Sequence, residues 1–235
     1  MKGSVTLVQS ARHLFRFAFV ILSVLALPVF ANAQDQASID ASKARRQAYL
    51  RFIEAQRLRG EAQRTNNARR LQESIEAYKD SIRLDPTAAE PHVDLGELYF
   101  FSQSRLDLAE NEALEAAKLD VTSVSARLLL ARISMTGLRF EKEQKPEQIE
   151  RAARAYEEVV RLDNGLTEGW AMLAELYEQK GDKTKQLHAL ERWTGSPVPN
   201  DPAFYRWLMN QDLSQDQAYY ELSMLYRKLG RSNDA

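Results

Sequence analysis

Histidines, cysteines and paired carboxylates carry much of protein chemistry, and their spacing in this sequence favours none of the common reactions. His92 and His188 are the only histidines after residue 33, and neither stands in a metal-binding pattern such as HExxH. The sequence has no cysteine, no glycine-rich phosphate loop and no GxSxG nucleophile motif. We therefore predict no catalytic residue, no metal site and no cofactor.

Carboxylates are frequent, but they occur at helical spacing, as in ENEALE (110–115) and YEEVV (156–160). This pattern is typical of a solvated helix face with ion pairs, and it is much less often an acid–base pair. We therefore expect that these carboxylates are not catalytic and that the chain is not an enzyme.

Two of the three tryptophans suggest a cluster near the C-terminal end. Trp193 ends a predicted helix, and Trp207 lies in a short predicted helix with Phe204 and Tyr205. The favoured interpretation is that these rings pack together in the core. The alternative is a small-molecule site at Trp193 and Trp207.

Composition indicates an ordinary globular chain. The 235 residues are 28% charged, with a formal net charge of −1, which is enough for one sizeable core. No basic excess points to nucleic acid, and no polybasic stretch points to an anionic membrane surface.

The first 33 residues form a separate segment. A basic start (Lys2 to Arg16) precedes the apolar run FAFVILSVLALPVF (17–30) and the small residues ANA (31–33). This order predicts a signal peptide (1–33) that is cleaved between Ala33 and Gln34. The alternative is an uncleaved anchor, although the run contains Pro28 and is short for a span of about 20 residues.

Cleavage would change the charge of the chain. It removes three of the 32 basic side chains and none of the 33 acidic ones, which leaves a formal net charge of −4. We expect no stable membrane insertion of the mature chain. Its stability must come from packing, because it has no cysteine for a disulfide.

A phrase of base, leucine and aspartate occurs three times, as Arg83-Leu84-Asp85, Lys118-Leu119-Asp120 and Arg161-Leu162-Asp163. The aspartates are 35 and 43 residues apart, and such periods with two amphipathic helices each are typical of helical solenoids. The base suits the last helical turn, where carbonyls carry partial negative charge. The leucine is the last expected core contact, and the aspartate ends the helix and begins the turn.

Further positions align with this period. First helices carry Leu95-Gly96 with Tyr99, Leu173-Ala174 with Tyr177, and Leu222-Ser223 with Tyr226. Second helices carry a small–aromatic–small type of pattern: Ser74, Tyr78, Ser81; Ala109, Ala113, Ala116; Ala152, Tyr156, Val159. Over roughly residues 45–235 this arrangement resembles the tetratricopeptide repeat (TPR). The resemblance implies an all-α, right-handed superhelical solenoid of antiparallel helix pairs, in which Trp170 is a core residue.

The expected organisation has four parts. The signal peptide (1–33) is followed by a flexible leader (34–41) and by a solenoid of about four helix pairs (42–195), of which the first is divergent. Residues 196–235 then hold a break, a short helix at 202–210 and an incomplete further repeat. The expected helices are 42–64, 71–82, 89–101, 105–119, 123–136, 146–162, 167–180, 183–194 and 215–229.

The long connection at 136–150 has two interpretations. It is either a longer turn in which Pro146 opens the next helix, which we favour, or a protruding contact loop. By the repeat register, Ala235 stands at the first small position of a second helix. We expect either a longer reading frame or a half-unit that a partner covers.

The resemblance also implies a site, because TPR solenoids usually hold a peptide or a partner helix in the concave groove lined by first helices. By register the partner-binding residues would be Glu90, Val93, Glu97, Phe100, Phe101, Leu128, Arg132, Met135, Glu168 and Glu175. The Phe100-Phe101 pair either faces the groove or folds back under the turn. Glu97 and Glu175 stand where one subset of the family has a Lys and Asn carboxylate clamp, so we expect an acidic groove that prefers a basic-apolar segment.

The function that follows is a non-catalytic protein–protein interaction scaffold outside the cytoplasm, periplasmic or extracellular, in what looks like a bacterium. Its partner would be a protein or peptide and not a nucleic acid. The alternative is the N-terminal repeat region of a larger exported enzyme or envelope assembly or transport component.

Overall fold

The computed structural model describes residues 36, 38–140, 145–197, 214–231 and 234, and no strand occurs in this part of the chain. Three predicted features lie outside the described residues: the signal peptide (1–33), the short helix at 202–210, and Trp207 with its aromatic neighbours. The described helices begin with a helix over 38–65, called here the N-terminal helix. It is followed by α2 (Ala68–Leu84), α3 (Glu90–Gln103), α4 (Leu106–Leu119), α5 (Val124–Phe140), α6 (Pro146–Leu162), α7 (Thr167–Lys180), α8 (Lys183–Thr194) and α10 (Gln215–Lys228).

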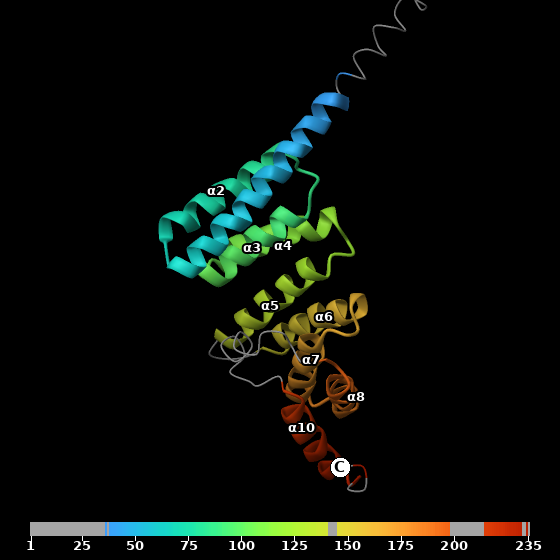
Figure 1. The fold of residues 1–235 in the computed structure, drawn as a ribbon. Helices are drawn as coiled ribbons and strands as arrows, with labels where there is room; N and C mark the ends of the chain where they lie inside the picture. The colour runs from blue at the N-terminus through green and yellow to red at the C-terminus, as the bar shows by residue number, and fades with distance from the viewer. Residues whose placement is uncertain (1–35, 37, 141–144, 198–213, 232–233, 235) are drawn as a thin grey trace, which may run out of the picture.

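The helices stack as antiparallel pairs along one direction, from the N-terminal helix to α10 (Figure 1). α3 packs on α4, α5 on α6 and α7 on α8, while α4–α5 and α6–α7 contacts join successive pairs and α10 packs on α8. Two buried serines fasten α2 to the N-terminal helix, since Ser74 Oγ donates to the Ala55 carbonyl and Ser81 Oγ to that of Ala48, both at 2.8 Å. We call the N-terminal helix, α3, α5, α7 and α10 the first helices, and α2, α4, α6 and α8 the second helices.

Two helices extend beyond their expected ends. Residues 38–41 belong to the N-terminal helix, where the sequence favoured a flexible leader, and Gln36 Nε2 donates to Asp40 Oδ1 (3.1 Å) across this turn. α5 continues to Phe140 instead of ending near residue 136, because Gly137 is tolerated inside the helix. α6 begins at Pro146, as the favoured interpretation of the connection expected.

The base–leucine–aspartate joints follow the predicted design. Arg83, Lys118 and Arg161 lie in the last turns of α2, α4 and α6. Each aspartate caps its helix and accepts a backbone N–H two residues later: Asp85 from Thr87 (3.1 Å), Asp120 from Thr122 (2.9 Å) and Asp163 from Gly165 (2.9 Å). The leucine contact holds only in part. Leu84 and Leu162 are half-buried, but Leu119 is 40% exposed.

The predicted stripe on the second helices is the centre of the core. All nine predicted positions, from Ser74 to Val159, are at most 1% exposed. Small residues allow close helix crossings, as the register predicted. A Cβ added to Gly96 of α3 would lie 3.3 Å from the Ala109 carbonyl oxygen and 3.2 Å from Glu112 Cβ of α4.

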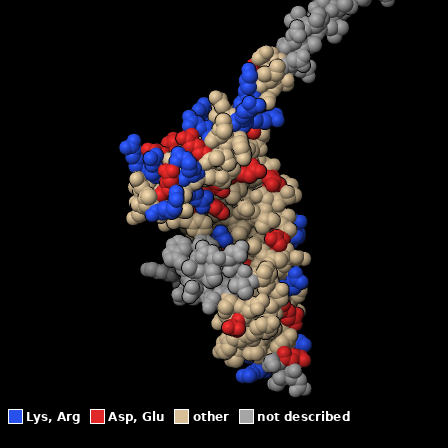
Figure 2. Space-filling view, viewed as in Figure 1, with Lys and Arg blue, Asp and Glu red and all other residues tan. Residues whose placement is uncertain are grey.

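Charged side chains of both signs are mixed over the N-terminal helix and α2 (Figure 2). Many form pairs one turn apart, such as Arg51 with Glu54 (2.7 Å) and Arg69 with Glu73 (3.0 Å). Such exposed pairs favour solubility more than stability. Within the described part of the chain, no helix has the length and apolar character needed to cross a membrane.

Candidate functional site

The predicted partner-binding residues lie on the first helices, but about half of them are buried. Val93, Phe100 and Met135 belong to the hydrophobic core, and Arg132 and Glu168 are buried as well. Phe101, Leu128, Glu97 and Glu175 are half-buried, and Glu90 is exposed. The two phenylalanines therefore differ. Phe100 lies in the core, whereas Phe101 is half-buried and meets the Phe100 ring edge-on, with 4.7 Å between the ring centres.

The acidic character expected of the groove is offset at Glu97 and Glu175, because both carboxylates are paired with arginines. Arg59 of the N-terminal helix binds Glu97 of α3 at 3.1 Å. Arg139 of α5 binds Glu175 of α7 at 2.9 Å. In both pairs the base lies on one first helix and the acid on a following first helix, so the charges neutralise each other and tie neighbouring repeats together.

The most buried of these links joins α5 to α7. Arg132 Nε donates to Glu168 Oε1 (2.8 Å), and Arg132 Nη2 donates to Glu168 Oε2 (2.6 Å). The Arg132 guanidinium also lies 5.8 Å from the centre of the Phe101 ring. Burial and the nearby Glu168 raise the pKa of the Tyr156 hydroxyl well above its usual value, so this tyrosine stays neutral. These residues support the fold more than they offer an open surface.

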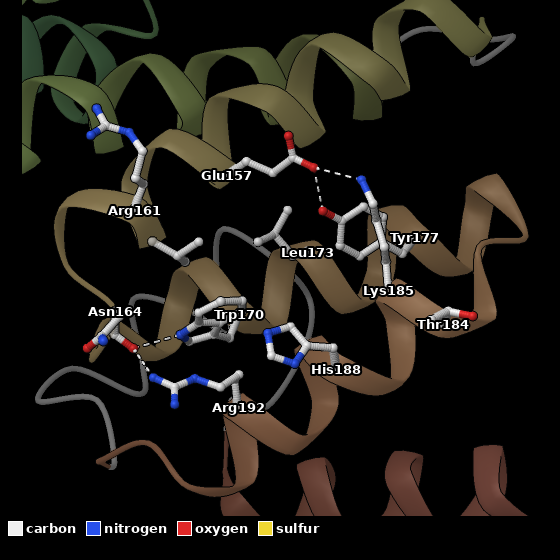
Figure 3. A pocket seen from close by; sticks show the side chains of 11 residues that line it. Glu157, Arg161, Asn164, Trp170, Leu173, Tyr177, Thr184, Lys185, His188 and Arg192 are labelled. Carbon is white, nitrogen blue, oxygen red and sulfur yellow. Dashed lines mark hydrogen bonds and ion pairs between the residues drawn. The ribbon is translucent and has the colours of Figure 1, made fainter.

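A larger open cavity lies between α6, α7 and α8, with a volume of about 750 Å³ (Figure 3). Its floor is formed by the buried residues Val160, Leu173 and Tyr177. The rest of its lining is polar, aromatic or cationic: Glu157, Arg161, Asn164, Trp170, Thr184, Lys185, His188 and Arg192. We call it the α6–α8 cavity.

Trp170, His188 and Arg192 form one end of this cavity, the Trp170 end. The indole N–H of Trp170 donates to the Asn164 carbonyl (2.8 Å), and Arg192 Nη2 donates to the same oxygen (3.1 Å). The Arg192 guanidinium lies 5.3 Å from the centre of the Trp170 ring, and His188 meets that ring edge-on at 5.6 Å. The expectation that Trp170 is core holds only in part: it packs against the hydrophobic core, but it is half-buried because its ring also lines the cavity. Trp193 is buried, as the favoured interpretation expected.

Glu157, Tyr177 and Lys185 form the opposite end, the Tyr177 end. One Glu157 oxygen accepts from the Tyr177 hydroxyl (2.5 Å) and from Lys185 Nζ (3.3 Å), as Figure 3 shows. Burial and the hydrogen bond to Glu157 raise the pKa of Tyr177 above its usual value. Lys185 Nζ also lies 5.2 Å from the Tyr177 ring centre. The charges at this end satisfy one another.

The chemistry of the α6–α8 cavity is that of binding. An apolar floor, an indole wall and a cationic rim suit an apolar group with a polar or charged neighbour. No group of three or more histidine, aspartate and glutamate side chains in the described residues could hold a metal ion.

The sequence-based prediction missed this cavity, although the sequence of α8 carries a signal for it. Lys185, His188 and Arg192 are spaced by three and four residues, which places them on one face of α8. That face lies opposite Trp170 across the α6–α8 cavity. The cavity itself depends on how the helix pairs stack, which the sequence pattern does not give.

Comparison with known proteins identifies the fold. No family model matches the chain, and no curated protein matches it in sequence. The crystal structure of MamA protein matches with a TM-score of 0.55 at 18% identity, over 80% of this chain and 85% of that one. YrrB, described as a TPR protein with an unusual peptide-binding site, matches with a TM-score of 0.50 at 16% identity, over 86% of this chain and 84% of that one.

MamA from Desulfovibrio magneticus RS-1, from residue 41 to its end, also matches with a TM-score of 0.50 at 14% identity, over 77% of this chain and 88% of that one. At such identities the likeness shows the fold alone. The chain has the TPR fold, a right-handed superhelical solenoid of antiparallel helix pairs, as the sequence predicted.

Proposed function

We propose that this chain, a solenoid with the TPR fold, is a non-catalytic scaffold that binds a segment of another protein. The observation that carries the proposal is the α6–α8 cavity, where α7 presents Trp170 and Tyr177 and α8 presents Arg192 beside apolar floor residues. Tryptophan, tyrosine and arginine are the residues that contribute most to binding at protein interfaces. The cavity volume of about 750 Å³ lies within the range of sites that hold small ligands or side chains.

The frame around the cavity supports this role because it is preorganised. The pairs Arg132–Glu168 and Arg139–Glu175 tie α5 to α7, and the Trp170 indole is held by the Asn164 carbonyl. A site on helices that are fixed in this way loses little conformational entropy when a partner binds. The stacked helices thus keep the cavity residues in place before a partner binds.

The first-helix face remains a second surface for the same function. Of the predicted partner-binding residues on this face, Glu90 is exposed to solvent, and Leu128 is half-buried. A peptide or partner helix would meet these residues beside the Arg59–Glu97 pair. YrrB is described as a TPR protein with an unusual peptide-binding site, so peptide binding occurs on a chain of similar fold.

We also propose that the protein acts outside the cytoplasm, since the order of charge, apolar run and small residues in 1–33 is that of a signal peptide. Expression of the full chain with its native start, followed by cell fractionation and mass spectrometry, tests this directly. A mature N-terminus at Gln34 in the exported fraction is expected. An intact Met1 start in the cytoplasm would exclude export.

The binding function is tested by selection from a displayed random-peptide library on the folded full chain. We expect peptides that bind the folded chain and lose binding when the chain is unfolded in urea. The selected peptides are then measured against Trp170→Leu, which alters the cavity, and against Leu128→Lys, which alters the first-helix face. A library that yields no peptide specific for the folded chain would remove the proposed function.

A further inference from the structure

The two ends of the α6–α8 cavity differ in the balance of their charges. At the Tyr177 end, Glu157 accepts hydrogen bonds from Tyr177 and Lys185, so acid and base neutralise each other. At the Trp170 end, the contacts of Arg192 among the described residues are a backbone carbonyl and an aromatic ring, and none is a carboxylate. Among the described residues, a ligand therefore meets positive charge without a paired carboxylate at the Trp170 end and not at the Tyr177 end.

We propose that the α6–α8 cavity binds an acidic polypeptide segment in which an aromatic or large aliphatic side chain stands next to a carboxylate. The apolar side chain lies on the floor against Trp170, and the carboxylate binds Arg192. This inference rests on the proposed function, because it names the class of segment that the scaffold holds.

The apolar part of the segment is fixed by the floor of the cavity. Leu173 and Val160 are buried beneath it, and they present carbon atoms to the cavity. The Trp170 ring forms the wall, with its nitrogen already bonded to the Asn164 carbonyl. An incoming ring can then stack on or meet the indole edge-on without leaving the indole N–H unpaired.

The acidic part is fixed by Arg192. Its guanidinium has five N–H donors, and Nη2 uses one of them on the Asn164 carbonyl. The remaining donors suit a carboxylate, which guanidinium groups bind through two parallel hydrogen bonds. His188, edge-on to the same indole, also lines this end of the cavity and has a ring N–H that can donate.

The other cations at the cavity rim strengthen the same preference. Arg161 pairs with Glu158 at 2.8 Å, but both side chains are exposed and such pairs are weak. Lys185 is shared between Glu157 and the Tyr177 ring. A basic segment would approach three cations, and the single lining carboxylate, Glu157, already has two donors.

The test measures fluorescence anisotropy of matched labelled peptides on the full chain. One short blocked peptide carries a phenylalanine flanked by aspartates, the second has lysines in place of the aspartates, and the third has alanine in place of the phenylalanine. The variants are Arg192→Gln, Arg192→Lys and Trp170→Leu. Arg83→Gln is the control, because it removes the same charge from an exposed last-turn arginine far from the cavity.

We expect the aspartate peptide to bind more tightly than both other peptides. Arg192→Gln should weaken it about tenfold, as the loss of a hydrogen bond to a charged group does. Arg192→Lys should recover part of the loss because it keeps the charge without the planar fork. Trp170→Leu should weaken it by a similar factor, Arg83→Gln should have no effect, and added salt should weaken the wild-type complex.

Equal or tighter binding of the lysine peptide, or binding unaffected by both Arg192→Gln and Trp170→Leu, would overturn the inference. Library-selected peptides decide the outcome if the three probes bind too weakly to measure. Those that lose binding on Trp170→Leu should be acidic beside an apolar residue, and basic ones would overturn the inference. Selected peptides that bind the folded chain elsewhere would leave the scaffold function standing while this inference fails.

Discussion

Arg132 of α5 and Glu168 of α7 form a bidentate ion pair at 2.6 and 2.8 Å, in which the Glu168 side chain has no exposed surface. The two residues are 36 positions apart and belong to different helix pairs. The pair therefore links one repeat to the next, and it does so where water cannot replace a lost partner.

Arg132→Met should lower the free energy of unfolding by about 3–5 kcal/mol, because it leaves the Glu168 carboxylate buried without its main cation. The double variant Arg132→Met with Glu168→Leu should recover most of this loss, since neither charge remains. Urea denaturation followed by circular dichroism measures both. The exposed pair Arg161–Glu158 is the control, and Arg161→Met should change stability by less than about 1 kcal/mol. A double variant as unstable as Arg132→Met would contradict this account.

Gly169 lies at a close contact between α7 and α6. A Cβ at this position would lie 2.5 Å from Val160 Cγ1, and valine cannot easily turn away because its χ1 angle is restricted. Gly169→Ala should therefore destabilise the chain by about 1–3 kcal/mol, although alanine is the better helix former. Thermal or urea unfolding measures the change.

Gly137 provides the matched control for Gly169, because it also lies inside a helix but has no atom within 4 Å of an added Cβ. Gly137→Ala should stabilise the chain by about 0.5–1 kcal/mol through helix propensity. A loss of stability in Gly169→Ala and a gain in Gly137→Ala would separate the effect of close packing from that of helix propensity. If both substitutions stabilise the chain, the close α6–α7 contact is wrong.

Asp85 closes the joint between α2 and α3. Its Oδ1 accepts from the Thr87 N–H (3.1 Å) and the Thr87 hydroxyl (2.6 Å). Asp85→Ala should lower the free energy of unfolding by about 1–2 kcal/mol, because both donors lose their partner. Asp85→Asn keeps an oxygen in the same place and should recover much of the loss. Equal destabilisation by alanine and asparagine in urea unfolding would show that the side-chain oxygen is not what matters.

Glu221 of α10 is a carboxylate whose ionisation opposes folding. Burial, together with the nearby Glu178 and Glu175, raises the pKa of Glu221 above its ordinary value of 4.5. The folded chain thus binds this proton more tightly than the unfolded chain does. The stabilising contribution is present below about pH 4.5 and is lost as pH rises through the folded pKa.

Glu221→Gln should therefore increase the hydrogen-exchange protection of α10 near neutral pH, and its advantage over wild type should shrink as the pH approaches about 4.5. Comparison at equal pH removes the intrinsic pH dependence of exchange. Glu150→Gln is the control with opposite sign, since hydrogen bonds from Lys180 and Arg154 lower the pKa of Glu150. A Glu221→Gln advantage that is the same at both pH values would contradict the prediction.

Much of the fold could be predicted because each helix carries its own signals. The expected ranges 146–162, 167–180 and 183–194 match α6, α7 and α8. Pro146 at the start of α6, Gly181 with a φ of 71° after α7, and Asp182, which accepts from Lys185 N–H, explain these ends by local physical chemistry. α5 runs past its predicted end near residue 136, and the helix accommodates Gly137.

The candidate site could be predicted only in part, since register tells which residues share a helix face and not what lies opposite that face. Glu97 and Glu175 were placed correctly on first helices, but their arginine partners are 36 to 38 residues away in the sequence. Trp170 is a second example. Its repeat position suggested core, and the gap between α6 and α8 leaves its ring half-exposed.

The sequence by itself determined the helices, their joints and the repeated stripe of small and aromatic residues, because caps, turns and the 3.6-residue period act over a few neighbouring positions. Only the tertiary structure decided which charges are buried in pairs and where an open cavity remains. Both depend on the angle and distance at which one helix pair settles on the next, and those follow from side-chain packing summed over many contacts between residues far apart in the chain.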